Sequence, residues 1–468
     1  MTLVAGVDSS TQSCTVVVVD AADGRVVRSG RAPHPEGTEV DPEHWWRALQ
    51  EAVAAAGGLD DVAAVSIGGQ QHGLVALGAD GAVLRPALLW NDTRSGKAAA
   101  DLVRERGAQA WADDTGTVPV ASITATKLRW MADHEPELAH RIAAVALPHD
   151  WLTWRLRGTG RLDDLTTDRS DASGTGYVDT NGTYRRDLLA HALRRPDADA
   201  IVLPHILGPS EGVEGRGIVL GPGCGDNAGA ALGLGLRPGD TSISIGTSGV
   251  VAAVSATSTH DASGLVAGFC DATGRHLPLA ATLNGARVLD ATARLLGVDH
   301  DGLTALALAA EPGAGGLVHV PYLEGERTPN LPTATGSLAG MSLRSMTREN
   351  LARAAVEGLW CLLHGALDAV RTQGIAIETV TLVGGAAQSA AVRAVAPSVL
   401  GLPVTVPETA EYVALGAARQ AAWVLAGGSE PPTWALATAA VVEGRHRPEI
   451  ADRYRSLAAE YAQRVDER

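Results

Sequence analysis

The feature that most constrains the fold is a pattern that occurs twice: a β-strand, a turn of small and hydroxyl-bearing residues, and a returning strand. The first copy lies at the amino-terminal end, where apolar residues 3–7 precede a polar stretch at 8–13 and a β-branched run at 15–19. The second copy places a strand, a turn and a strand at residues 241–245, 246–249 and 250–254. This repetition predicts two α/β lobes of the same architecture.

The lobe boundary is predicted near the polar turn at residues 236–240. We expect an N-terminal lobe over 1–238, a C-terminal lobe over 239–440 and a helical tail over 441–468. A length of 468 residues is sufficient for two to three domains of ordinary size. Further elements are expected: a helix starting at Asp41-Pro42, a strand at 62–68, a hairpin at 73–84 and a helix at 348–368.

Charge and cysteine content exclude several classes of function. The 38 basic and 53 acidic residues give a formal net charge of −15, and no run of Lys or Arg occurs, so we expect no nucleic-acid or membrane partner. The 4 cysteines contain no Cys-x-x-Cys pair, which favours neither a disulfide framework nor a zinc site and fits a cytoplasmic protein. No signal peptide and no bilayer-spanning apolar stretch is expected.

The two repeated turns share a chemical design. Each places small residues and hydroxyls between two strands, so backbone N–H groups can approach phosphate oxygens closely. A third segment, residues 382–389, runs from a strand through a glycine pair that would admit a flat ligand against the backbone. Each segment alone is a common turn, but their occurrence in this order in two repeated lobes is far more specific.

Five segments resemble those of the FGGY carbohydrate kinases, the family that includes xylulose, glycerol and gluconate kinases. They are residues 6–11, 122–134, 244–249, 336–357 and 384–385. The resemblance covers nearly the whole chain. It implies an α/β protein of two duplicated lobes with the actin-like ATPase (ribonuclease H-like) fold and a cleft between them. It also implies ATP as phosphate donor and Mg²⁺ as the metal.

Within the family, the chain is most similar to the xylulose-kinase branch. The segments that carry this similarity are residues 69–73, 89–92 and 321–329. The resemblance implies phosphorylation of D-xylulose to D-xylulose 5-phosphate, and it is compatible with a homodimer. Two alternatives stay open: a kinase for another ketose, polyol or sugar acid, and a catalytically weakened sensor that binds sugar or nucleotide. A chaperone or filament ATPase of the same fold is disfavoured by the sugar-site segments.

Asp226 is the expected general base. The segment Gly225-Asp226-Asn227 resembles the one that carries the family's catalytic aspartate. A helix is predicted to begin here, and a helix N-terminus keeps a carboxylate ionised, as a base requires. Without the resemblance, the same aspartate would be interpreted as a helix cap.

The resemblance also implies the remaining site residues. Asp8 is expected to hold Mg²⁺ through water, with a turn aspartate as the structural alternative. The residues expected to contact the sugar are Gln71, His72, Trp90, Asn91, Asp226 and Asn227. Those expected to contact the nucleotide are Ser10, Thr11, Gln12, Gly246, Thr247, Gly384, Gly385 and Gln388. The structural alternatives are turn hydroxyls, a buried structural histidine and a core tryptophan. Lys127 and Glu326-Arg327 match the family without a chemical role.

The first phosphate loop departs from the family pattern. Relatives commonly carry Lys or Arg a few residues beyond this loop, where this chain has Thr15, and no basic residue occurs before Arg25. Ser10 also stands in place of a loop glycine. Loss of a charge-assisted contact to the phosphate would slow turnover, unless a basic residue from elsewhere substitutes.

Overall fold

A computed structural model describes residues 1–466, and the chain forms two compact units. Unit 1 consists of Met1–Leu236, Ala256–Leu277 and Ala410–Leu436. Unit 2 consists of Arg237–Ser255, Pro278–Thr409 and the remainder of the chain from Ala437. The sequence analysis placed the start of the C-terminal lobe at residue 239, yet two segments of unit 1, Ala256–Leu277 and Ala410–Leu436, come after it. Neither unit is therefore one continuous stretch of chain.

The main sheet of unit 1 has the strand order β11-β12-β5-β1-β2-β3, with β13 paired to β5 off this path. Its strands are β1 Leu3–Ser9, β2 Ser13–Asp20, β3 Val26–Pro33, β5 Val62–Gly69, β11 Val213–Gly215, β12 Ile218–Leu220 and β13 Cys224–Gly225. The first predicted strand–turn–strand is confirmed. Asp8 and Ser9 belong to β1 rather than to the turn, because they continue the antiparallel ladder opposite Thr15 and Cys14.

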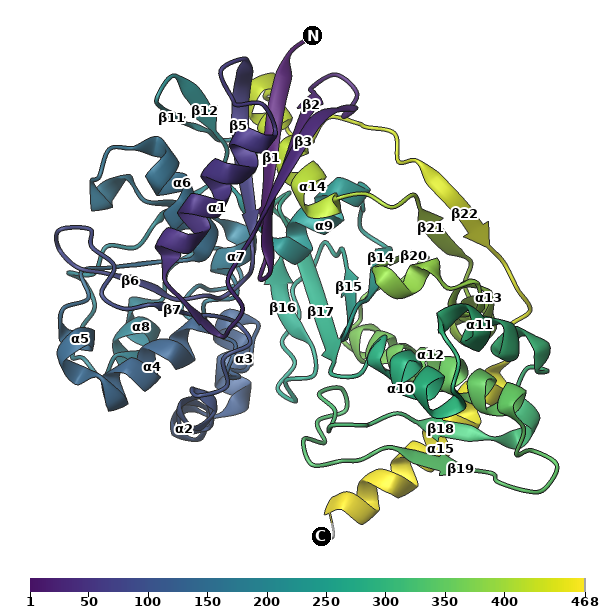
Figure 1. Ribbon diagram of the computed structural model, residues 1–468. Coiled ribbons are helices and arrows are strands. Elements are labelled where there is room, and N and C mark those ends of the chain that lie inside the picture. The colour runs from purple at the N-terminus through teal and green to yellow at the C-terminus, as the bar shows by residue number, and fades with distance from the viewer. Residues whose placement is uncertain (467–468) are drawn as a thin grey trace. The chain divides into compact units, whose positions relative to one another are not determined.

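Helices cover both faces of this sheet (Figure 1). The helices are α1 Pro42–Ala55 and α6 Pro148–Arg157 on one face, and α9 Asp226–Leu234 and α14 Tyr412–Ala426 on the other. Alternate residues of β1 serve the two faces, since successive side chains of a strand point to opposite sides. Val7 joins the core that includes α1, whereas Val4 packs with α14. At Gly6 an added Cβ would lie 1.9 Å from the carbonyl oxygen of Ala414, so only glycine lets α14 approach this closely.

The rest of unit 1 consists of short helices and paired strands. The helices are α2 Gly96–Arg106, α3 Ala108–Thr115, α4 Thr124–His134, α5 Pro136–His140, α7 Arg169–Ala172 and α8 Arg186–Ala192. The strands are β4 Glu39–Val40, β6 Val75–Leu77, β7 Ala87–Leu88, β8 Ala144–Ala146, β9 Thr166–Asp168, β10 His205–Leu207 and β16 Ala267–Cys270. The helix start at Asp41 is confirmed, since its carboxylate accepts a hydrogen bond from the N–H of Glu43 at 3.0 Å. The hairpin predicted at 73–84 is reduced to a single bridge between Leu77 and Val83, because β6 pairs with β8.

Unit 2 repeats the strand arrangement of unit 1. Its strands follow the path β22-β21-β20-β14-β15-β17 in a seven-stranded sheet. β14 pairs antiparallel with β15 and parallel with β20, as β1 does with β2 and β5. The strands are β14 Asp240–Ile245, β15 Gly249–Ala253, β17 His276–Thr282, β20 Thr379–Val383, β21 Val404–Pro407 and β22 Thr438–Val442. The predicted duplication of an α/β lobe is therefore confirmed strand by strand.

The helices of unit 2 surround its sheet and a two-stranded ribbon. They are α10 Arg287–Leu296, α11 His300–Ala309, α12 Arg348–Thr372, α13 Ala390–Leu400 and α15 Pro448–Asp466, and the ribbon is β18 Val318–Val320 with β19 Ser337–Ala339. The helix predicted at 348–368 is α12, which begins at Thr347, whose hydroxyl accepts from the N–H of Asn350 at 3.2 Å. The region of the predicted helical tail contains α15, and its side chains Ile450 and Tyr454 are buried.

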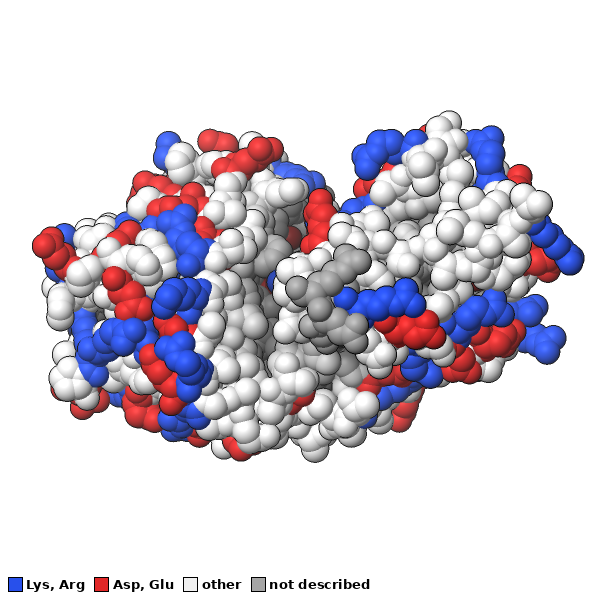
Figure 2. All heavy atoms as spheres, turned by 90° about the horizontal axis from the view of Figure 1, so that it is seen from below, with Lys and Arg blue, Asp and Glu red and all other residues white. Residues whose placement is uncertain are grey.

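The surface carries charges of both signs. Figure 2 shows Lys and Arg interspersed with Asp and Glu on the face in view. Among the described residues, no helix is long and apolar enough to cross a membrane.

Candidate active site

Three parallel strands of unit 1 bring the predicted sugar-site and metal-site residues to one edge of the sheet. β1 and β13 both run parallel to β5, with Asp8 and Cys224 opposite Gly68. Since the carboxyl ends of parallel strands meet at one edge, Asp8, the residues after Gly69 and Asp226 emerge together. The backbone topology thus gathers residues that are more than 200 positions apart in the chain.

Asp226 is the first residue of α9, after Gly225 as the N-cap. Its Oδ1 accepts the backbone N–H of Asn227 at 2.7 Å and the side-chain Nδ2 of Asn227 at 2.8 Å. Burial raises the pKa of Asp226 to about 6 against the effect of these hydrogen bonds. The predicted helix start is confirmed, but the helix N-terminus does not hold the pKa low, because burial is the larger effect. The result is a carboxylate that gains and loses its charge close to neutral pH.

Asp8 is a half-buried acid with other acids nearby. Burial, Asp226 and Glu411 raise the pKa of Asp8 to about 8, and Arg31 opposes the shift. Its Oδ1 is buried without a hydrogen-bond partner. A carboxylate in such surroundings is stabilised by any cation that binds next to it.

Gln71 and His72 follow β5 directly. Gln71 Oε1 accepts from Nδ2 of Asn227 at 2.8 Å, which ties the segment after β5 to the start of α9. The His72 ring packs on Gly174, where an added Cβ would lie 2.0 Å from Cε1. Burial and the charge of Lys127 lower the pKa of His72 to about 3, so the imidazole is neutral and can donate one hydrogen bond and accept another.

Trp90 and Asn91 lie beside the first phosphate loop. Trp90 is 37% exposed, and its Nε1 donates to Oγ1 of Thr11 at 2.9 Å, so it does not fill the core. The Oδ1 of Asn91 is buried and has no hydrogen-bond partner. Buried polar atoms are normally paired, so this oxygen is open to a donor from a ligand.

The first phosphate loop is a tight turn between β1 and β2. The N–H and the hydroxyl of Ser10 both donate to the carbonyl of Ser13 at 3.0 Å. Ser10 is therefore engaged with its own turn, as the structural alternative expects. Gln12 is exposed, and the Thr11 hydroxyl retains its own hydrogen for donation while its oxygen accepts from Trp90.

The predicted nucleotide residues of unit 2 lie at the corresponding edge of the second sheet. β14 and β20 run parallel with Ser244 opposite Val383, so the turn at Gly246-Thr247 and the pair Gly384-Gly385 follow neighbouring strand ends. An added Cβ at Gly384 would lie 2.6 Å from the carbonyl oxygen of Ile245, whereas one at Gly385 would meet nothing within 4 Å. Gln388 is exposed and its Nε2 donates to Oγ1 of Thr409 at 2.7 Å. This edge offers an open, flat backbone surface next to a hydroxyl-bearing turn.

Models of two protein-family domains match this chain. The N-terminal domain of the FGGY family of carbohydrate kinases matches residues 3–214, and the C-terminal domain of that family matches residues 241–425. The chain belongs to the FGGY family of carbohydrate kinases. Both the recognition from five segments and the fold class are thereby confirmed.

Relatives of this FGGY kinase match it over almost the full length. A xylulose kinase of Streptomyces coelicolor is 46% identical, with 96% of this chain and 94% of the relative covered. One from Streptomyces rubiginosus is also 46% identical, over 96% of this chain and 94% of the relative. A crystal structure of a xylulose kinase from Bifidobacterium adolescentis is 50% identical with a TM-score of 0.93, covering 98% of this chain and 99% of that one.

Two family-matching residues that received no chemical role have structural partners. Lys127 is fully buried in α4, and its Nζ donates to the carbonyl oxygens of Ala121 and Ser122 at 2.9 and 2.6 Å. In unit 2, Glu326 is 1% exposed and accepts from the N–H of Leu283 at 2.5 Å and from Nδ2 of Asn284 at 2.9 Å. In this FGGY kinase these residues hold loops in place.

A buried charge cluster beneath the sugar-site segment has no counterpart among the sequence predictions. The Nε2 of His149 lies 3.3 Å from Asp150, 3.5 Å from Asp168 and 3.4 Å from Asp171. Burial lowers the pKa of His149, but the three carboxylates raise it more, to about 9. His149 is therefore an imidazolium, and we call this group the His149 cluster.

The His149 cluster and Ser170, which lies between two of its members in the chain, contact both sides of the site. Asp171 Oδ1 accepts from the backbone N–H of His72 at 3.3 Å. Ser170 Oγ accepts from the N–H of Gly225 at 3.1 Å, directly before Asp226. In the sequence, His149-Asp150 follows an apolar run and residues 168–171 carry three charges, but nothing there indicates that the two segments meet.

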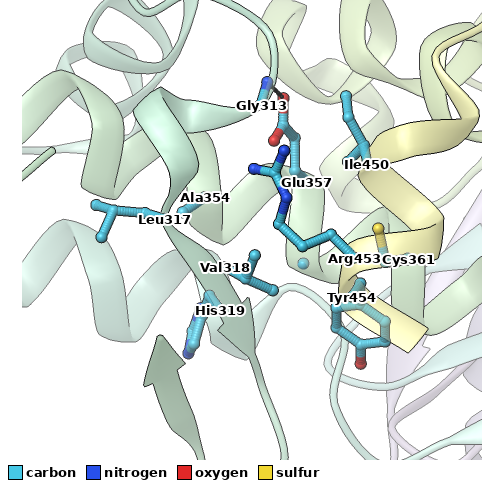
Figure 3. Close-up of a pocket in the computed structure, with 11 residues that line it drawn as sticks. Gly313, Leu317, Val318, His319, Ala354, Glu357, Cys361, Ile450, Arg453 and Tyr454 are labelled. Atoms are coloured by element: carbon cyan, nitrogen blue, oxygen red, sulfur yellow. Dashed lines mark hydrogen bonds between the residues drawn. The ribbon is translucent and has the colours of Figure 1, made fainter. Parts of the chain in front are cut away.

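A pocket in unit 2 contains none of the predicted site residues. It lies among α12, α15 and β18, and Figure 3 shows the Arg453 side chain extending toward Glu357. Glu357 accepts from the N–H of Gly313 at 2.9 Å and from Nε of Arg353 at 2.7 Å. The Gly313 contact fixes α12 against the loop before β18, and the Arg353 contact lies within α12. We therefore interpret these pocket residues as structural.

Proposed function

We propose that this chain transfers the γ-phosphate of ATP to the terminal hydroxyl of D-xylulose, giving D-xylulose 5-phosphate. Kinases of the FGGY family use ATP. The observation that carries the choice of sugar is 46–50% identity to xylulose kinases across nearly the whole of both chains. The gathering of Asp8, Gln71, His72 and Asp226 at one sheet edge supports it.

In this proposal Asp226 accepts the proton of the attacking hydroxyl. Both protein hydrogen bonds to its side chain go to Oδ1, so Oδ2 is available to a substrate. Asn227 orients the carboxylate and, with Gln71, His72, Trp90 and Asn91, binds the remaining sugar hydroxyls. Buried polar groups built for a hydroxyl reject sugars that lack it, because those groups would then be left unpaired.

The residues present fit a magnesium ion at Asp8. Its Oδ1 is buried and unpartnered, and Asp226 and Glu411 add negative charge nearby. Among the described residues no group of three or more His, Cys, Asp or Glu side chains is arranged to hold a metal ion. That fits Mg²⁺, which commonly takes one or two carboxylates and completes its shell with water and phosphate oxygens. When bound, the ion would neutralise charge on the transferring phosphoryl group.

The nucleotide is assigned to the two turns and the glycine pair. Ser10, Thr11 and Gln12 in unit 1 and Gly246 and Thr247 in unit 2 would donate to phosphate oxygens. The residues assigned to the adenosine part are Gly384, Gly385 and Gln388, supported by the open surface at Gly385. A cytoplasmic location belongs to the same proposal, supported by four unpaired and buried cysteines. The homodimer stays a prediction.

A substrate panel tests the choice of sugar. Purified protein with MgATP is given D-xylulose, D-ribulose, glycerol or D-gluconate, and ADP release is followed. We expect kcat/KM to be highest for D-xylulose. A higher value for any other member of the panel would replace xylulose as the substrate, and ADP release that is independent of sugar would contradict a sugar kinase.

The pH dependence of the rate tests the base. Only ionised Asp226 accepts a proton, and burial raises its pKa from 3.8 to about 6, so kcat/KM for the sugar is expected to fall as pH drops through about 6. Asn227→Ala removes a side-chain hydrogen bond that lowers this pKa, so the acid limb is expected to move to higher pH. Asn181→Ala, in an exposed turn, is the control, and it should leave the acid limb of the kcat/KM profile at the same pH. If kcat/KM of the parent falls only near pH 3.8, Asp226 is not the base.

A further inference from the structure

The edge of unit 1 that holds Asp8 is rich in negative charge. The charges of Asp226 and Glu411 both act on Asp8 there, and a nucleotide would add further negative charge. Phosphoryl transfer depends on cations that stabilise the charge on the phosphoryl oxygens. Thr15, the residue opposite Asp8 on β2, provides none.

The register of the sheet places Arg31 beside Thr15, on the side away from Asp8. Asp8 of β1 is opposite Thr15 of β2, and Thr15 is opposite Arg31 of β3. Residues directly opposite in a sheet project from the same face, so these three side chains form one cross-strand row. The row lies on the face covered by α14, just beyond the start of that helix, because Gly6, two residues before Asp8, packs against Ala414.

The Arg31 side chain is directed toward the phosphate loop. Its Nε donates to Oγ of Ser13 at 3.2 Å, a residue diagonal to it on the neighbouring strand. Arg31 is exposed and forms no ion pair with any described residue. By contrast, Arg28 on the same strand pairs with Asp61, at 2.5 Å. Arg31 therefore presents a guanidinium that is held in no ion pair at the rim of the turn between β1 and β2, close enough for its charge to act on Asp8.

We propose that Arg31 binds the terminal phosphate of the nucleotide and supplies the positive charge that the position of Thr15 lacks. This inference rests on the proposed function, because it assumes that a nucleoside triphosphate binds at the turn between β1 and β2. A planar guanidinium with free terminal nitrogens is suited to phosphate oxygens. The inference adds a nucleotide contact that comes from the third strand of the sheet rather than from the loop itself.

Replacement of Arg31 tests the proposal in two readouts. Arg31→Gln is expected to lower kcat/KM for ATP by about 10- to 100-fold, the usual range for one hydrogen bond to a charged group. Calorimetric titration with ATP and with ADP is expected to show that the variant loses its preference for ATP, since only ATP carries the terminal phosphate. Arg28→Gln, on the same strand with its charge paired to Asp61, is the matched control and should change neither quantity.

A charge-restoring variant separates this role from a structural one. Thr15→Lys in the Arg31→Gln background places an ammonium in the same cross-strand row, and Arg31→Lys keeps the charge at its own position; both are expected to recover ATP preference. If Arg31→Gln matches the parent in both readouts, the inference is overturned. A parent that phosphorylates no sugar would instead overturn the proposed function, so the two failures are distinguishable.

Discussion

Replacing Asp226 with Asn is expected to lower kcat for D-xylulose by about 10²- to 10⁴-fold, the range that general acid–base catalysis contributes. The amide keeps the shape of the carboxylate, and its oxygen can still accept the two hydrogen bonds from Asn227. It cannot accept the proton of the sugar hydroxyl. Affinity for ATP should not weaken, because the change removes negative charge from the neighbourhood of Asp8.

The control for this variant is Asp179→Asn. Asp179 Oδ1 accepts from the N–H groups of Asn181 and Thr183 at 2.8 Å, so it holds a turn and has no place in the proposed chemistry. Its replacement should leave kcat close to that of the parent. Steady-state rates and ATP titrations of both variants test whether Asp226 is the general base. An Asp226→Asn enzyme with the parent's kcat would show that it is not.

The largest effect on stability is expected from His149→Leu. This change removes the one cation of the His149 cluster and leaves three buried carboxyl groups, in two of which, Asp150 and Asp171, burial already raises the pKa. Removing one partner from a buried ionic group costs about 3–5 kcal/mol of unfolding free energy. Because Asp171 accepts from the N–H of His72, loosening of the cluster should also raise KM for the sugar.

His319→Leu is the matched control for that variant. His319 is a half-buried histidine of unit 2 whose pKa burial alone lowers to about 4, so it is neutral and its removal breaks no ionic contact. Urea unfolding followed by circular dichroism should therefore show a much smaller loss for His319→Leu. Equal losses in the two variants would show that the imidazolium does not stabilise the fold.

The stabilising effect of His149 should depend on pH. Its folded pKa of about 9 lies above the ordinary value of 6.5, so its contribution is fully present below 6.5 and is lost as pH rises through about 9. The difference in unfolding free energy between parent and His149→Leu is thus expected to narrow on the alkaline side. A difference that widens there would have the wrong sign for a buried imidazolium.

Local patterns in the sequence were sufficient to predict the repeated strand–turn–strand unit at the start of each sheet. The β-branched run at 15–19 and its counterpart at 250–254 each follow a polar turn, and both became returning strands. The packing of the segment Ala410–Leu436 against β1 was not predictable in this way. Its helix α14 contacts residues some 400 positions away. The apolar pattern of the helix does not determine which strand it packs against.

The candidate site was predictable in its residues but less so in its electrostatics. The start of α9 at Asp226 followed from the small residues around it, and the helix N-terminus suggested a low pKa. Burial reversed that direction, and burial depends on the packing of distant segments. Arg31 was missed for a related reason: its position opposite Thr15 depends on the register of a hairpin that includes a bulge at Val18 and Val19.

The most direct test of the central claim is a crystal structure of the protein with D-xylulose bound. We expect the oxygen of the terminal hydroxyl to lie within hydrogen-bond reach of Asp226 Oδ2, at about 2.6–3.2 Å. We also expect His72 and Asn91 to contact other hydroxyls of the same sugar. A sugar bound away from this sheet edge, or one whose terminal hydroxyl faces away from Asp226, would contradict the account.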